Sequence, residues 1–183
     1  MPIIIVTGTP GTGKTTVSRI LSKNLSIPLV EVNKLVEEKH IYHGYNREKG
    51  YKEVDLVDLD TELEQLIANS DEDGLIIEGH LAHQIKNLKE IDHIIVLRAR
   101  PDILRKRLNT RNWPESKIQE NIEAEALDIC TYEAVENHDK KVNELNTTDL
   151  NLENVVDQIM EVVNGEKYFP PGRVDFLEFM YSL

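Results

Sequence analysis

The segment from Gly8 to Thr16 constrains the fold of this 183-residue chain more than any other feature. It carries the pattern G-x-x-x-x-G-K-[ST]. An apolar run, Ile3–Val6, precedes it, and apolar residues at helical spacing follow it from Val17 to Leu25. A glycine-rich turn between a buried strand and an amphipathic helix is the setting in which this pattern binds phosphate. Because both flanking elements fit, we set aside the alternative of a glycine-rich turn with an incidental lysine.

Each residue type in this loop has a defined chemical use. Glycines such as Gly11 and Gly13 let successive backbone N–H groups point at phosphate oxygens, where side chains would obstruct the approach. The helix that begins near Lys14 directs free N–H groups and its positive dipole end at the same anion. Lys14 is expected to reach the β- and γ-phosphates of ATP, and the Thr15 hydroxyl to ligate Mg²⁺. Together with Thr16, these residues are the predicted contacts for Mg-ATP.

The rest of the chain alternates between buried strands and helices. Short apolar runs bounded by turn signals predict strands that are buried on both faces, as in a parallel sheet. These runs are Leu29–Val32, Leu75–Ile77 and Ile94–Leu97, with Val142–Leu145 as a weaker candidate. Helical spacing predicts helices over about 58–68, from Pro101 onward, from Pro114 to about Asn137, and over 155–163. This rhythm predicts one doubly wound α/β domain over residues 1–183, a central parallel sheet flanked by helices.

A second candidate group follows the apolar run at Leu75–Ile77. The run places Glu78 at the carboxyl end of a buried strand, on the sheet edge where the phosphate loop also lies. Glu78 is therefore the predicted carboxylate partner for Mg²⁺, and His80 is positioned to orient a water or a phosphoryl acceptor. The alternatives are a strand-end carboxylate without a metal role and a structural or capping histidine. His83 invites a zinc interpretation, which the lack of further ligands disfavours.

Basic residues cluster within a 14-residue stretch of an otherwise acidic chain. This clustering predicts a site for a polyanion, and arginines that close over a transferring phosphate stabilise its transition state. Arg107 and Arg111 are four residues apart and so are expected to share a helix face, while a solvated face is the alternative for other members. Trp113 is expected to be a core anchor rather than a cover over an adenine ring. The cluster comprises Arg98, Arg100, Arg105, Lys106, Arg107 and Arg111.

Charge and composition limit the partners of the chain. The net charge of −12 disfavours binding to bulk nucleic acid and would suit a basic protein partner, although charge by itself favours solubility alone as the explanation. No apolar run approaches the roughly 18 residues of a membrane span, and no signal peptide is expected. Cys130 is the single cysteine, so an intrachain disulfide and multi-cysteine metal sites are excluded. A cytoplasmic setting is therefore expected.

Several stretches together resemble a known family. They are the phosphate loop as the first turn, Glu78-Gly79-His80, and Arg111-Asn112-Trp113 followed by Lys117–Ile122 and Glu125. Ile41–Tyr45 and Pro170-Pro171-Gly172 extend the likeness over nearly the whole chain. The sequence resembles the small adenylate-kinase-like proteins of archaea and eukaryotic nuclei, the isoenzyme-six type, also described as small-subunit ribosome-maturation ATPases.

The resemblance implies a nucleoside monophosphate kinase fold with two mobile parts. These are an acceptor-binding arm at about 30–53 and a short lid at about 110–120, in which Arg111 touches ATP; residues 166–183 form a C-terminal tail. Glu78 matches the Walker B acid of the family and His80 its catalytic histidine. Members transfer phosphate from ATP to a monophosphate with broad specificity and hydrolyse ATP. They also act in small-subunit maturation through transient binding of small-subunit ribosomal protein eleven.

One departure from the family pattern bears on the acceptor. Adenylate kinases usually carry an arginine in the first helix of the acceptor arm, whereas Val32–Lys39 offers only lysines. Lysine cannot hold a phosphate in a bidentate fork, so weaker monophosphate binding is expected. The segment 31–73 is also acidic, which suits a basic protein. Three hypotheses follow: a monophosphate kinase, an ATP-switched assembly factor with incidental kinase activity, and a small-metabolite kinase.

Overall fold

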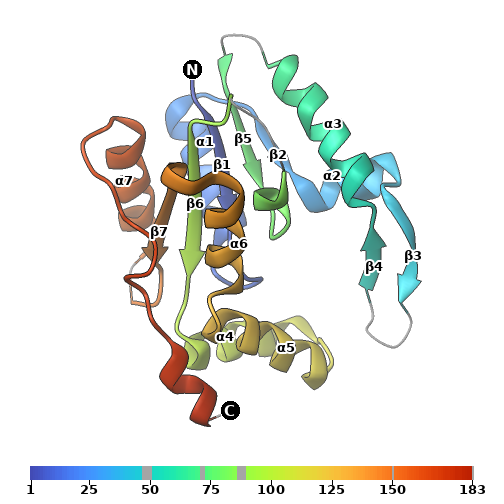
Figure 1. The fold of residues 1–183 in the computed structure, drawn as a ribbon, viewed down its shortest axis with the longest axis vertical. Helices are drawn as coiled ribbons and strands as arrows, with labels where there is room; N and C mark the ends of the chain where they lie inside the picture. The colour runs from blue at the N-terminus through green and yellow to red at the C-terminus, as the bar shows by residue number, and fades with distance from the viewer. Residues whose placement is uncertain (47–50, 71–72, 86–89, 150, 183) are drawn as a thin grey trace.

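A parallel five-stranded sheet forms the centre of the computed structural model, which describes residues 1–46, 51–70, 73–85, 90–149 and 151–182 (Figure 1). The strand order is β2-β5-β1-β6-β7. Every neighbouring pair in this sheet is parallel, with Ile5 of β1 opposite Ile77 of β5 and Ile94 of β6. The strands are β1 (Ile3–Thr7), β2 (Leu29–Glu31), β5 (Leu75–Glu78), β6 (His93–Arg98) and β7 (Val142–Asn146). The predicted α/β fold with a central parallel sheet is confirmed.

Alternating residues of the central strand supply the two halves of the core. Ile3 and Ile5 of β1 belong to one buried cluster, and Ile4 and Val6 belong to the other. Successive side chains of a strand point to opposite faces, so a strand that is apolar at every position must be covered on both sides. Each fully buried isoleucine or leucine contributes about 1.5–3 kcal/mol, which makes this two-sided core the main source of stability.

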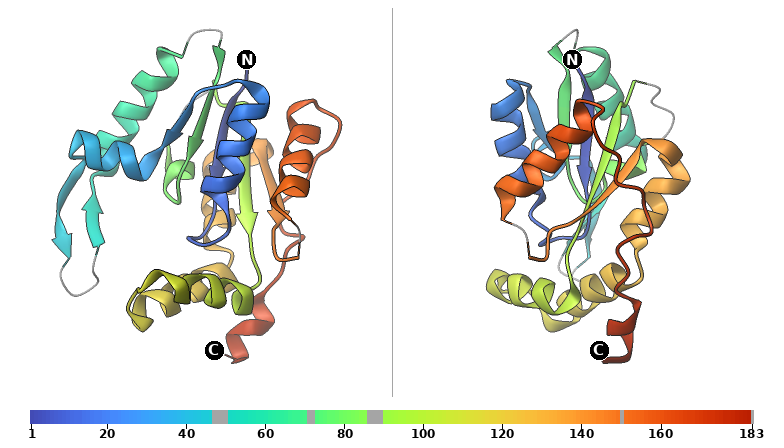
Figure 2. Two further views of the ribbon diagram at one scale, coloured as in Figure 1. Left: turned by 180° about the vertical axis from the view of Figure 1, so that it is seen from behind. Right: turned by 90° about the vertical axis from the view of Figure 1, so that its left-hand side faces the viewer.

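Helices cover both faces of the sheet. The helices α1 (Lys14–Leu25) and α7 (Leu152–Val163) pack together on one face, as the rear view in Figure 2 shows. The opposite face is covered by α3 (Leu56–Ala68) and α6 (Ile129–His138). The side chain of Asp55 caps α3 by accepting from the N–H groups of Val57 and Asp58. These helices leave the carboxyl ends of β1 and β5 uncovered, which is where the phosphate loop and Glu78 lie.

An arm projects from the sheet between β2 and α3 (Figure 1). It consists of α2 (Val32–Lys39) and an antiparallel hairpin of β3 (Tyr42–Asn46) and β4 (Tyr51–Val54). The prediction that β2 runs to Val32 was wrong, because the strand ends at Glu31 and Val32 begins α2. Part of the predicted acceptor arm, residues 47–50, lies outside the described residues.

The predicted long helix from Pro114 to about Asn137 was wrong. The chain forms α5 (Glu115–Ala126) and then α6, with Asp128 between them at φ 56°. This left-handed residue reverses the chain and brings Asp128 and Glu125 to the same buried arginine, Arg98. The preceding helix, α4 (Pro101–Leu108), opens with a proline at its first turn as expected, and packs on α5.

Short 3₁₀ turns complete the described chain. They lie at Ala82–Gln84, Asn109–Arg111, Asp139–Lys141 and Leu177–Ser182. The C-terminal turn sits beside α5 at the lower end of Figure 1, away from the N-terminus. No helix within the described ranges is both long and apolar enough to cross a membrane.

Candidate active site

The phosphate loop links β1 to α1 through glycines that no other residue would replace without strain. A Cβ atom at Gly8 would lie 2.3 Å from the carbonyl oxygen of Leu97, and Gly8 has φ 133°. Gly13 stands at the N-terminus of α1 with φ 99°, and no side chain caps this helix. The backbone therefore curls against β6 and presents the uncapped first turn of α1 to the space above the sheet. That geometry suits a bound phosphate.

Lys14 begins α1 and is buried beneath the loop. Its Nζ donates to the carbonyl oxygen of Thr9 over 3.0 Å. Burial lowers the pKa of Lys14 to about 8, while the nearby carboxylate of Glu78 raises it in part. The ammonium thus sits in a poorly hydrated position from which an incoming phosphate would gain a strong electrostatic contact.

Glu78 ends β5 next to the loop and is 7% exposed. Burial raises the pKa of its carboxyl group, and Lys14 and a hydrogen bond from the Thr15 hydroxyl oppose that shift. The two oxygen donors that the sequence assigned to Mg²⁺ therefore lie near one another in the same cleft. A hydroxyl and a carboxylate fit an ion that takes oxygen ligands and keeps several waters and phosphate oxygens. These residues present a donor set that suits Mg²⁺.

His80 and His83 occupy different environments. His80 is half-buried at the cleft, and burial, assisted by the charge of Lys14, lowers its pKa to about 4. The imidazole is therefore neutral near pH 7 and free to exchange hydrogen bonds with water or an acceptor. His83 is fully buried instead, with Nδ1 2.7 Å from the Thr7 hydroxyl and Nε2 2.9 Å from a Glu133 oxygen. Its contacts are structural.

One cleft of about 940 Å³ brings all eight predicted site residues together. This volume lies near the upper end of the roughly 300–1,000 Å³ range of small-molecule sites. The phosphate loop forms one wall, and the arm forms the opposite wall. The eight residues are Gly11, Gly13, Lys14, Thr15, Thr16, Glu78, His80 and Arg111.

The segment predicted as the lid places two cationic side chains beside an indole ring. Arg111, in the turn after α4, lies 5.3 Å from the ring of Trp113, and Lys117 lies 4.2 Å from it. Trp113 packs on the small cluster between α4 and α5, as expected of a core residue, and it also lines the cleft. Its ring is close to two cations at the cleft.

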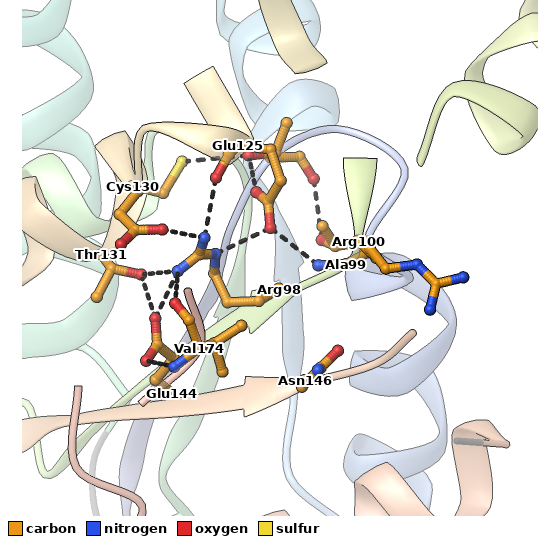
Figure 3. A network of polar contacts seen from close by, with 12 residues as sticks. Arg98, Ala99, Arg100, Glu125, Cys130, Thr131, Glu144, Asn146 and Val174 are labelled. Carbon is orange, nitrogen blue, oxygen red and sulfur yellow. Dashed lines mark hydrogen bonds and ion pairs between the residues drawn. The ribbon is translucent and has the colours of Figure 1, made fainter. Parts of the chain in front are cut away.

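The predicted polyanion site of six basic residues is not a single site. Arg98 is fully buried among carboxylates (Figure 3), and Arg100 pairs with Asp102 in its own helix. Arg107 donates to the carbonyl oxygens of Gly11 and Thr147 and so braces the loop from behind. It shares no helix face with Arg111, because α4 ends at Leu108. Within the described chain, Arg111 alone of the six lines the cleft.

The arm wall carries residues that no motif marked. Lys52 of β4 lines the cleft, pairs with the Glu37 carboxylate of α2 and lies 4.1 Å from the ring of Tyr42. Asn33 and Tyr45 line the same wall. Tyr45 and Lys52 face one another through hairpin pairing, and Asn33 comes from α2, so sequence spacing carried no signal for this wall.

Comparisons with known proteins agree with this geometry. A family model described as "AAA domain" matches residues 4–128. A protein of Methanothermobacter thermautotrophicus named "Putative adenylate kinase" is 39% identical over 175 residues, which is 95% of this chain and 96% of that protein. Proteins of the same name from Natronomonas pharaonis and Archaeoglobus fulgidus are 38% and 39% identical, over 97% and 96% of this chain and 99% and 92% of theirs.

Solved structures show the same fold at low identity. The shikimate kinase of Acinetobacter baumannii in complex with shikimate gives a TM-score of 0.63 at 18% identity, over 91% of this chain and 95% of that one. The shikimate kinase of Bacteroides thetaiotaomicron gives 0.57 at 17% identity, over 89% and 98%. This likeness establishes a P-loop kinase fold.

Proposed function

Because the chain belongs to the AAA-domain family, and within it to the small archaeal adenylate-kinase-like proteins, we propose that it transfers phosphate from Mg-ATP to a nucleoside monophosphate. The observation that carries this proposal is the shared cleft. A phosphate loop, a carboxylate, a neutral histidine and Arg111 line it on one side, and a separate arm lines it on the other. Such a site has room for a donor and an acceptor in line.

The donor side would be the phosphate loop. Backbone N–H groups at Gly11 and Gly13 and the first turn of α1 would surround the β- and γ-phosphates, with Thr16 beside them. Lys14 would leave the carbonyl of Thr9 for a phosphate oxygen. Arg111, which lies in the proposed lid, would approach the transferring group as the lid closes.

Thr15 and Glu78 would hold the magnesium ion that accompanies ATP. The bound ion neutralises charge on the β- and γ-phosphates. The Thr15 hydroxyl lies near the Glu78 carboxyl group, and its oxygen lone pairs would be available to the ion. Thr15 lies in the first turn of α1 and Glu78 ends β5, so they would bring the ion into place without movement of the sheet.

His80 would place the acceptor. Its low pKa keeps the ring neutral, so one nitrogen can accept and the other can donate near pH 7. An acceptor phosphate oxygen would attack the γ-phosphorus, and the bond to the β–γ bridging oxygen would break, which leaves ADP. Positioning and charge neutralisation, rather than covalent chemistry, would supply most of the acceleration.

Lys52 would supply a cation in place of the arginine that α2 lacks. The absent arginine in Val32–Lys39 predicts weaker monophosphate binding, but Lys52 reaches the same wall from the hairpin. Its ion pair with Glu37 would have to open for a phosphate to bind, which would reduce affinity without abolishing it. We therefore expect monophosphate binding that is weaker than ATP binding.

An ATPase function in small-subunit maturation is the second candidate, and a small-metabolite kinase is the third. A neighbouring hollow of about 450 Å³ carries the carboxylates of Asp60, Glu64, Glu133 and Glu136, which would suit a basic partner such as small-subunit ribosomal protein eleven. In this case water would take the place of the acceptor, and hydrolysis would release the partner. The shikimate kinases show only the fold, so they do not favour the third candidate.

The test measures ADP and free phosphate together. Purified protein is given Mg-ATP alone, then Mg-ATP with AMP, CMP, UMP, GMP or shikimate. The proposal expects diphosphate formation that depends on at least one monophosphate, with little free phosphate. Phosphate release that ignores every acceptor would contradict it and favour the ATPase, and turnover with shikimate alone would favour the third candidate.

A further inference from the structure

Arg98, at the carboxyl end of β6, is the largest side chain that the described core buries fully. Its Nε lies 2.8 Å from the Glu125 carboxylate and its Nη1 lies 2.6 Å from that of Glu144, while Nη2 contacts Asp128 (Figure 3). Nη2 also donates to the backbone carbonyl of Glu125 over 2.9 Å. A buried charge costs several kcal/mol unless it is fully paired, so such a cluster calls for an explanation beyond filling space.

Glu125 connects this cluster to the phosphate loop. It is 1% exposed, and its Oε1 accepts from Arg98 and from the backbone N–H of Ala99. Its Oε2 accepts from the hydroxyl of Thr9 over 2.5 Å. Thr9 is itself a loop residue and is 2% exposed. One carboxylate of α5 thus joins the end of β6 to the second residue of the loop.

Thr9 in turn sets the resting place of Lys14. The carbonyl oxygen of Thr9 accepts from Lys14 Nζ over 3.0 Å and from the Thr12 hydroxyl over 2.9 Å. Rotation of Thr9 would therefore move both the carbonyl that holds the ammonium and the neighbouring backbone N–H groups. Binding energy for a phosphate is lost when such groups must first be ordered.

The C-terminal tail closes the other side of the cluster. The Oε2 atom of Glu144 accepts from the backbone N–H groups of Gly172, Arg173 and Val174 over 2.9, 3.2 and 3.2 Å. The Phe176 ring lies 5.4 Å from the Arg98 guanidinium and is 6% exposed. Residues 172–176 therefore exclude water from the arginine and keep its ion pairs strong.

We propose that Glu125, held by Arg98, is a positioning residue for the phosphate loop, which acts through the Thr9 hydroxyl to strengthen the binding of Mg-ATP. The inference rests on the proposed function to the extent that the loop binds ATP. It adds a connection that no sequence motif marks, from the junction of α5 and α6 to the resting place of Lys14. Neither Glu125 nor Arg98 lines the cleft in the described structure, so the effect is indirect.

The test is a double-mutant cycle on the dissociation constant for Mg-ATP, measured by titration calorimetry without any acceptor. Glu125→Gln removes the charge with little change of volume, and Thr9→Val removes the hydroxyl in the same way. Each single variant is expected to raise the dissociation constant about tenfold, in keeping with the loss of one charge-assisted hydrogen bond. The double variant should be no weaker than the weaker single variant, because both changes remove the same contact. An additive effect, about a hundredfold, would overturn the proposal.

Two controls separate positioning from general damage. Thr9→Ser keeps the hydroxyl and should bind Mg-ATP within about twofold of the unaltered protein. Thr131→Val removes a hydroxyl that contacts Arg98 and Glu144 but not the loop, so it should lower the melting temperature without weakening ATP binding. If Thr131→Val weakens binding as much as Glu125→Gln does, the proposal fails.

The remaining outcomes are also decisive. If Glu125→Gln does not fold, the pair of Thr9 variants still decides: a Thr9→Val protein that binds ATP normally would overturn the proposal. If the unaltered protein does not bind Mg-ATP at all, the proposed function fails and this inference fails with it. If the unaltered protein binds Mg-ATP but the effects of Glu125→Gln and Thr9→Val are additive, this inference fails and the proposed function stands.

Discussion

At the residue scale, a single substitution tests the proposed role of His80 directly. Changing His80 to Ala should lower the rate of diphosphate formation about a hundredfold, because an acceptor displaced by about 1 Å loses that much. ATP affinity should remain nearly unchanged, since the phosphate loop is intact. The measurement is kcat with saturating AMP beside a calorimetric titration with Mg-ATP.

A matched control for His80 lies on the arm. His43 is exposed, pairs with Asp55 and does not line the cleft, so His43→Ala should leave the rate within about twofold. Normal turnover in His80→Ala would show that the histidine does not place the acceptor.

Substitutions of Lys52 and Glu37 should change the KM for the acceptor in opposite directions. Lys52→Ala should raise the KM for AMP about tenfold or more, because a charge-assisted contact is worth about 1.5–3 kcal/mol. Glu37→Gln should lower it, since it frees Lys52 from its ion pair. The KM for ATP should stay constant in both variants, which steady-state kinetics with each substrate varied in turn will show.

The control for this pair is Lys39→Ala. Lys39 lies on the same helix, α2, but pairs with Glu62 outside the cleft. It should leave the KM for AMP unchanged. If Lys39→Ala and Lys52→Ala raise the KM for AMP equally, the effect comes from the overall charge of the arm rather than from a specific contact.

At the element scale, the Glu144 carboxylate is one of the contacts that hold the C-terminal tail to the domain. Glu144→Gln should destabilise the protein by about 3 kcal/mol in urea unfolding, because it breaks a buried pair with Arg98. It should also speed tryptic cleavage after Arg173, whose N–H now bonds to Glu144. Both measurements report whether the tail depends on the buried cluster.

A surface pair provides the comparison. Glu161 pairs with Lys167 where both side chains are partly exposed, so Glu161→Gln should cost at most about 1 kcal/mol. Similar losses in the two variants would mean that the tail contact contributes little.

Elements with local signals were predictable, and elements set by distant contacts were not. The phosphate loop, β1 and the first-turn proline of α4 follow from patterns a few residues long, and all three were predicted. The break between α5 and α6 was missed because the apolar spacing continues through it. At this break, Glu125 and Asp128 both bind Arg98. These residues lie 27 and 30 positions after Arg98 in the sequence, so the contact depends on tertiary folding.

The basic cluster shows that site residues, too, cannot be predicted from sequence when distant contacts decide where they lie. Six cations in 14 residues look alike in sequence, yet Arg98 is buried while Arg111 lines the cleft. The carboxylates that neutralise Arg98 come from α5, β7 and the α5–α6 junction, so their approach depends on tertiary folding. Lys52 was missed for the corresponding reason, because the packing of the hairpin against α2 brings it to Glu37.

At the scale of the whole molecule, buried histidines predict sensitivity to mild acid. Burial lowers the pKa of four histidines below the ordinary value of 6.5, to about 4 for the one at the cleft. The unfolded chain therefore binds more protons as pH falls below 6.5, and folding stability declines by up to about 1.4 kcal/mol per pH unit for each group. The four are His80, His83, His93 and His138.

Urea unfolding between pH 7.5 and 5.5 measures this dependence. Glu78 and Asp128 act in the opposite direction, because burial raises their pKa values, but they are two groups against four. A midpoint that falls steadily below pH 6.5 is expected. A midpoint that stays constant or rises would show that the histidines are hydrated in the folded protein.

The fate of the γ-phosphoryl group tests the central claim most directly. In a single turnover, the protein is mixed with less than one equivalent of γ-labelled ATP, Mg²⁺ and excess AMP, and the labelled products are separated. The account predicts label at the β-position of ADP, little labelled phosphate, and no transfer by a Lys14→Ala variant. Label that appears only as free phosphate, at the same rate with and without AMP, would contradict it.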